Sequence, residues 1–126
     1  MNFPENLKYT KDHEWILADG KTGTVGITEH AQGELGDVVF VELPSVGKAL
    51  KQHDSFGTIE AVKAVSDLYA PIAGTVAEVN KDLATTPELV NKDPYGKGWM
   101  IRITIANPQE LASLMDAATY RKLIGK

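Results

Sequence analysis

The chain contains no cysteine among its 126 residues. This absence excludes disulfides, thiolate metal sites and a cysteine nucleophile, and it suits a reducing compartment. Any sulfur chemistry would therefore have to come from a cofactor. Apolar runs long enough to cross a bilayer are also missing, so we expect no membrane partner.

No strong charge bias is present either, because charged residues make up 24% of the chain and the formal net charge is -4. We therefore expect neither a nucleic-acid partner nor binding to an anionic membrane surface. Residues 1–6 lack the basic and apolar regions of a secretory signal, so a cytoplasmic, bacterial-type protein is expected. With 43% apolar residues, the chain is expected to form one domain with its own core.

Motifs for metal binding and for several kinds of catalysis are absent. The only histidines are His13, His30 and His53, and no two of them have the i, i+4 spacing of helical zinc ligands. The glycine-rich run at 20–26 matches neither a dinucleotide fingerprint nor a phosphate loop, and no serine lies in a Gly-x-Ser-x-Gly pattern. We therefore predict no metal site and no catalytic residue.

Alternation of apolar and polar side chains recurs along the chain and predicts short strands. These runs cover residues 24–27, 38–43, 58–62, 65–69, 75–79 and 99–105. Strands this short and this closely spaced predict a mainly β domain, either a small sandwich or a barrel.

Helical patterns are confined to two places. Thr28 is a suitable N-cap for a short internal helix that stops near Gly33 or Gly36. The second pattern begins at Asn107, with Pro108 at the first helical position and Glu110 as the acid of a capping box. It continues as an apolar stripe over Leu111, Leu114, Met115, Ala118 and Leu123, and a break at Asp116 is expected to divide it into two short helices.

Lys63 lies between two β-prone runs and just before Ser66 and Asp67, whose side chains favour a turn. This setting predicts an amine at the tip of a tight hairpin, where a modifying enzyme can reach it. The alternative is an ordinary solvated surface lysine.

His13, Glu14 and Trp15 form a second polar cluster. Glu14 at the rim of a cleft would accept hydrogen bonds from a cation. In the alternative interpretation, Trp15 anchors a strand to the core while His13 and Glu14 are merely exposed.

Several separated blocks of the sequence, taken in order, resemble the H protein of the glycine cleavage system. They are KY at 8–9, HEW at 13–15, GITEHAQ at 26–32, LGDVVFVELP at 35–44, EAVKAVSD at 60–67, APIAG at 70–74 and PYGKGWMI at 94–101. The resemblance runs from about Tyr9 to Ile105, and the C-terminal tail is also typical of that family.

This resemblance implies a barrel-sandwich hybrid of the lipoyl/biotinyl hammerhead type, with a short internal helix and C-terminal helices. It implies a single domain over 1–126, with a lipoyl-type β core at about 22–104 and a helical tail at about 107–124. Lys63 would bear lipoate in amide linkage, and the chain would be a monomeric, non-catalytic carrier.

The implied partners are those of an aminomethyl shuttle. They are a pyridoxal-phosphate glycine decarboxylase, a tetrahydrofolate-dependent aminomethyltransferase and an FAD-containing dihydrolipoyl dehydrogenase. A lipoate ligase or octanoyltransferase would attach the arm.

The resemblance also implies a cleft on the carrier that shelters the loaded arm from water. It would be lined by Glu14, Asp67 and Asp12, with His30 near the arm. Rigidity at the root of the arm is expected from the residues around the hairpin, namely Gly57, Glu60, Val62, Ala64, Pro71 and Gly74, with Val62 and Val65 packing or pairing across it.

Two other classes remain open. The chain resembles, less closely, a biotinyl domain or the lipoyl domain of a 2-oxoacid dehydrogenase, but Val62 and Ala64 flank the lysine where those families usually carry methionines or an aspartate. A role in relaying lipoate to other proteins is a further variant. The second class is a small enzyme with Lys63 as a Schiff-base nucleophile, which would need an apolar pocket around the amine.

Overall fold

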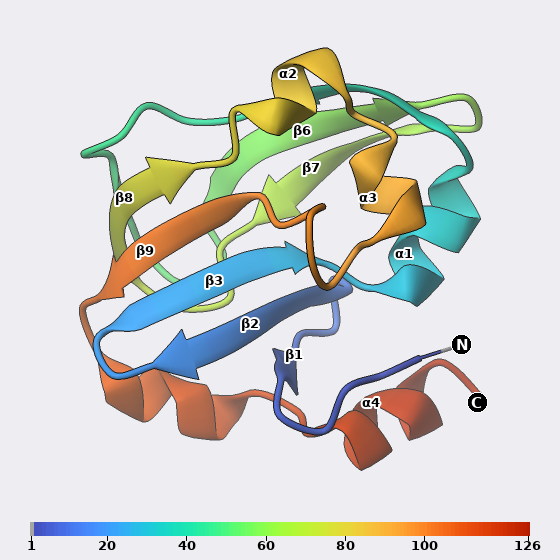
Figure 1. Cartoon of the computed structure of the whole chain (residues 1–126). Coiled ribbons are helices and arrows are strands. Elements are labelled where there is room, and N and C mark those ends of the chain that lie inside the picture. The colour runs from blue at the N-terminus through green and yellow to red at the C-terminus, as the bar shows by residue number, and fades with distance from the viewer. Residues whose placement is uncertain (1) are drawn as a thin grey trace.

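The computed structural model describes residues 2–126, and its two antiparallel sheets confirm the prediction of a mainly β protein (Figure 1). The six-stranded sheet has the order β1-β2-β3-β9-β8-β5, and the three-stranded sheet has the order β4-β6-β7. The strands of the larger sheet are β1 (Lys8–Tyr9), β2 (Glu14–Asp19), β3 (Thr22–Ile27), β5 (Ala49–Leu50), β8 (Gly74–Val79) and β9 (Ile101–Ile105). Those of the smaller sheet are β4 (Val38–Glu42), β6 (Ser55–Ala61) and β7 (Val65–Tyr69).

Alternation along the strands directs one row of side chains into the space between the sheets. Ile16 and Val25 of the larger sheet and Ile59 and Leu68 of the smaller sheet are almost fully buried in one cluster. The sheet begins well before residue 22, because β2 pairs with β3 over its whole length, from Glu14↔Ile27 to Asp19↔Thr22. Gly20, at a positive φ of 61°, allows the tight turn between these two strands.

The internal helix α1 (Glu29–Leu35) has the predicted caps. The Thr28 hydroxyl accepts a hydrogen bond from the Ala31 N–H at 3.1 Å. Gly36 is the C-cap, with a φ of 79°, whereas Gly33 lies inside the helix. The helix therefore uses the second of the two predicted stops.

The prediction of helices in only two places is wrong, because α2 (Asp82–Thr85) and α3 (Leu89–Lys92) were missed. Neither helix has a side-chain cap, and each is too short for an apolar stripe to show. Tertiary burial of Leu83 and Val90 holds them instead. Figure 1 shows α3 beside α1, on the side of the molecule where β6 and β7 are joined.

The C-terminal tail is divided at Asp116, as predicted, into a 3-10 helix η1 (Pro108–Ser113) and α4 (Ala117–Leu123). The predicted capping box is wrong, because the Glu110 carboxylate accepts a hydrogen bond from the Ala73 N–H at 2.7 Å instead of closing on Asn107. The glutamate therefore ties the tail to the β core.

The predicted stripe is also wrong at Ala118 and Leu123, which are exposed. Asp116 caps α4 afresh, so the helical phase changes and Ala117 and Tyr120 are buried instead. These two residues belong to a second apolar cluster, which joins the tail to the N-terminal segment and includes Phe3, Leu7, Tyr9 and Trp15.

Candidate functional site

Lys63 lies at the tip of the hairpin that joins β6 and β7, as predicted. Residues 62–64 form the turn and are exposed, and the Ala61 N–H donates to the Ala64 carbonyl at 2.9 Å. Among residues 2–126 the Lys63 ammonium has no ion-pair partner. The amine is therefore reachable and is not engaged in holding the fold.

The backbone of this tip is held by the segment after α1. The Val62 N–H donates to the Asp37 carbonyl at 3.0 Å, and the Lys63 N–H donates to the Leu35 carbonyl at 3.1 Å. Gly36 lies under the Lys63 side chain, since a Cβ at position 36 would lie 3.3 Å from Lys63 Cγ. The tip is thus rigid in its backbone although its side chain is free.

The predicted valine brace is only partly present. Val65 pairs with Glu60 across the hairpin, and Glu60 pairs in turn with Phe40 of β4. Val62 pairs with no residue of β7, and the side chains of Val62 and Val65 are 71% and 68% exposed. Packing between the two exposed valines therefore does not explain the rigidity of the hairpin tip. Backbone hydrogen bonds explain it instead.

The other predicted support residues act at some distance from the tip. A Cβ on Gly57 would overlap the Glu42 carbonyl oxygen, and one on Gly74 would lie 2.6 Å from the Thr104 carbonyl oxygen. Both glycines therefore allow close approach of neighbouring strands. Pro71 is buried, and its carbonyl accepts from the Gln52 amide at 3.1 Å.

A cleft of about 130 Å³ lies between the start of β2, α1 and β7. It brings together three of the predicted cleft residues, Asp12, Glu14 and Asp67, and adds Glu34 of α1. His30 is not part of its lining. The His30 ring instead lies 5.0 Å from the His13 ring, and its Nε2 lies 3.7 Å from Glu34 Oε1.

Glu14 is the buried acid of the cleft, with only 2% of its surface exposed. Its Oε1 accepts from the Thr10 hydroxyl at 2.9 Å, and its Oε2 accepts from the Tyr69 N–H at 3.2 Å. Burial raises the pKa of Glu14 to about 8, although these hydrogen bonds oppose the shift. The alternative in which Glu14 is merely exposed is therefore wrong.

The neighbouring His13 forms part of the cleft wall and is held by the C-terminal helix. The Tyr120 hydroxyl lies 2.8 Å from His13 Nδ1 and 2.8 Å from Thr28 Oγ1. Burial lowers the pKa of His13, and the adjacent His30 adds to this effect. Trp15 anchors β2 as proposed, because its indole N–H donates to the carbonyl groups of Ile27 and Pro94 at 3.0 and 3.1 Å.

Sequence reasoning missed Glu34, Tyr120 and Thr10 as parts of the site. Glu34 could have been found, because it lies four residues after His30 on a helix that was predicted. Nothing in the local sequence joins Tyr120 to His13, since they lie 107 positions apart.

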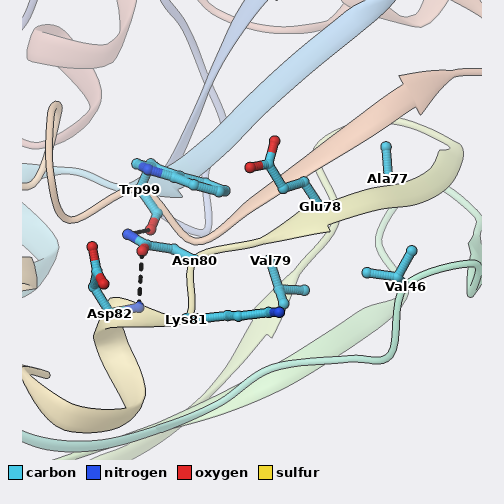
Figure 2. Close-up of a pocket in the computed structure, with 8 residues that line it drawn as sticks. All are labelled: Val46, Ala77, Glu78, Val79, Asn80, Lys81, Asp82 and Trp99. Atoms are coloured by element: carbon cyan, nitrogen blue, oxygen red, sulfur yellow. Dashed lines mark hydrogen bonds between the residues drawn. The ribbon is translucent and has the colours of Figure 1, made fainter.

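A second hollow, of about 470 Å³, lies at the end of β8, and Figure 2 shows the residues that line it. The Asn80 amide there donates to the carbonyl groups of Lys97 and Trp99 at 2.8 and 2.7 Å, and its oxygen accepts from the Asp82 N–H at 3.2 Å. The Asn80 side chain thus stabilises the backbone at residues 82, 97 and 99. None of the predicted site residues lines this hollow.

Within residues 2–126, no group of three or more histidine, aspartate and glutamate side chains is arranged to hold a metal ion. None of the helices in this part of the chain is long and apolar enough to cross a membrane.

Known proteins resemble this chain over nearly its whole length. A family profile described as "Glycine cleavage H-protein" matches residues 7–126. The "Glycine cleavage system H protein" of Chlorobium luteolum is 60% identical over 99% of both chains, and that of Symbiobacterium thermophilum is 58% identical over 94% of this chain and 93% of its own.

A solved structure agrees with the fold. The crystal structure of a glycine cleavage system H protein from Mycobacterium marinum is 38% identical and has a TM-score of 0.90, covering 98% of this chain and 100% of its own. This confirms the predicted fold class, a β architecture of two sheets with a few short helices. The chain belongs to the glycine cleavage H-protein family, which consists of non-catalytic carrier subunits.

Proposed function

We propose that Lys63 carries lipoate in amide linkage and that the chain moves the aminomethyl group of glycine between enzymes of the glycine cleavage system. The observation that carries this proposal is the free amine of Lys63 on the exposed tip of a backbone-held hairpin. An acylating enzyme has unhindered access to such an amine. Carriers of this system need an attachment point of this kind.

Lipoate held by Lys63 would supply the dithiolane chemistry for carrying the aminomethyl group between glycine decarboxylase and aminomethyltransferase and for passing electrons to dihydrolipoyl dehydrogenase. The chain itself supplies the fixed root of this arm. Backbone hydrogen bonds from Val62 and Lys63 keep the root in place, while the lysine side chain adds rotatable bonds. A tether of this kind raises the effective concentration of its end at a partner's active site.

We assign the sheltering of the arm to the cleft beside the hairpin. Asp12, Glu14, Asp67 and Glu34 are all acids, so the cleft suits a protonated amine. Glu14 is the group best shielded from water, which strengthens its interaction with a cation. The cleft thereby slows the loss of the one-carbon unit to water.

The outer face of the smaller sheet suits short encounters with partner enzymes. Phe40 is 49% exposed and shares a row with Glu60 and Val65, next to the tip. Apolar side chains beside an acid provide contact area without the extent of a permanent interface. On this proposal the chain works in the bacterial cytoplasm, as a single domain with a β core that includes β1 and β2 and with a helical tail at about 107–124.

The test is the intact mass of the purified chain before and after incubation with lipoate, ATP and a lipoate ligase. We expect one lipoyl group, which peptide mapping assigns to Lys63. A biotinyl group on the native protein would support a biotin carrier instead, because the two groups differ in mass. Borohydride trapping of Lys63 with a carbonyl compound would support the Schiff-base enzyme.

The role of the cleft is tested on the loaded carrier. Glu14→Ala should shorten the lifetime of the loaded form in water and leave lipoylation unchanged. The control is Asp19→Ala, an exposed acid at the far end of the same strand. Equal lifetimes for the wild type and Glu14→Ala would remove the cleft from the proposed function.

A further inference from the structure

Asn91 of α3 is hydrogen-bonded to three groups around the end of α1. Its amide nitrogen donates to the Gly36 carbonyl and to Gln32 Oε1, both at 2.9 Å. Its side-chain oxygen accepts from the Val38 N–H at 2.8 Å. One side chain therefore holds both ends of the segment 36–38, which links α1 to β4.

The same segment is the support of the hairpin tip. The carbonyl groups of Leu35 and Asp37, on either side of Gly36, accept from the Lys63 and Val62 N–H groups at 3.1 and 3.0 Å. The hydrogen bonds from Asn91 and those from the tip therefore meet on adjacent residues of the segment 35–38.

Gly36 also lies beneath the methylene chain of Lys63. A Cβ on this residue would lie 3.3, 3.4 and 3.5 Å from Cγ, Cδ and Cε of Lys63. The methylene chain of Lys63 therefore runs over a position with no side chain. Gly36 also has a φ of 79°, which an L side chain rarely adopts.

We propose that Asn91 is a positioning residue for Lys63, which presupposes that Lys63 is the lipoate acceptor. By fixing residues 36–38, Asn91 holds the backbone of the tip and the surface along which the lysine stem lies. The amine then meets the modifying enzyme already oriented, and less conformational freedom is lost in the acylation step. The local sequence around Lys63 contains no sign of this residue.

The experiment compares Asn91→Ala with Asn80→Ala as lipoylation substrates of a lipoate ligase. Asn80 is a matched control because its amide also donates twice and accepts once, but the groups that it holds are at residues 82, 97 and 99. Asn91→Ala should lower kcat/KM for the full-length chain by about threefold to tenfold, the factor that corresponds to losing one net hydrogen bond. Hydrogen exchange at the Val62 and Lys63 amides should speed up by a similar factor, and Asn80→Ala should change neither measurement.

Gly36→Ala gives an independent test that leaves Asn91 in place. It should lower the lipoylation rate, whereas Gly47→Ala, at a φ of 95° with no atom within 4 Å of its added Cβ, should not. Wild-type rates and unchanged amide exchange in Asn91→Ala would overturn the positioning role. So would an equal loss in Asn80→Ala. A wild-type chain that gains no lipoyl group at Lys63 would overturn the proposed function itself.

Discussion

Lys63 and Glu14 both carry ionisable groups, but the fold exposes the first and buries the second. Lys63 projects from a turn into water, and only its backbone is held. Glu14 lies 2% exposed between the two sheets, and both of its oxygens are hydrogen-bonded. The amine is left free and exposed, and the carboxyl is withdrawn from water.

The electrostatic consequences follow from burial. An exposed amine needs no partner, whereas the withdrawn carboxyl has a pKa raised to about 8. The cleft acid is therefore largely protonated at neutral pH until a cation approaches. A protonated amine in the cleft would favour the ionised form of Glu14 and displace its proton.

The largest effect is expected from removing the amine at the exposed site. Lys63→Arg keeps a positive charge but has no acylatable amine, so lipoylation and aminomethyl transfer should be lost completely. The Tm should not change, because the Lys63 side chain makes no ion pair among the described residues. Intact mass and a transfer assay measure the loss. The control, Lys48→Arg, should be lipoylated as the wild type is, and a lipoyl group on Lys63→Arg would contradict the assignment.

The burial of Glu14 should make the free energy of unfolding depend on pH. The pKa of Glu14 is raised in the folded chain, so between about pH 4.5 and 8 the carboxyl ionises in the unfolded chain but stays protonated in the folded one, and the stability falls as pH rises. Relative to Glu14→Gln, which cannot ionise, the wild-type free energy of unfolding should fall by roughly 4 kcal/mol over this interval. Urea unfolding at pH 5, 6.5 and 8 measures it, with Asp19→Asn as the exposed control. A constant difference between wild type and Glu14→Gln would contradict the raised pKa.

A smaller effect is expected in the strand that leads to the exposed site. Gly57→Ala would push its Cβ against the Glu42 carbonyl oxygen of β4 and separate the two strands. We expect a loss of about 1–3 kcal/mol in the free energy of unfolding. Gly33→Ala is the control, since nothing lies within 4 Å of its added Cβ and alanine favours the helix. If both variants are equally stable, the close approach of β4 and β6 does not require glycine at position 57.

The smallest effect is expected at the edge of the buried site. Tyr120→Phe removes the hydroxyl that contacts His13 and Thr28, and about 1 kcal/mol of stability should be lost. Tyr69→Phe, whose exposed hydroxyl lies 3.5 Å from Asp67, should lose less. Thermal unfolding at pH 7.5 compares the two. A larger loss in Tyr69→Phe would show that Tyr120 does not support the cleft wall.

Local features of the chain could be predicted well. The hairpin around Lys63 and the caps of α1 at Thr28 and Gly36 depend on residues a few positions apart. The errors fell where tertiary contacts outweigh local preference. Glu110 binds the Ala73 N–H rather than its own helix end, and the new cap at Asp116 changes which face of α4 is buried.

The sequence by itself determined the exposed half of the candidate site, because turn residues and β-prone runs beside Lys63 are sufficient to form a hairpin with the lysine at its tip. Only the tertiary structure decided the buried half. It withdrew Glu14 from water, set Glu34 beside it and linked Asn91 to the support of Lys63. The physical reason is distance along the chain: desolvation and hydrogen bonds between remote segments exist only after the sheets and helices have packed.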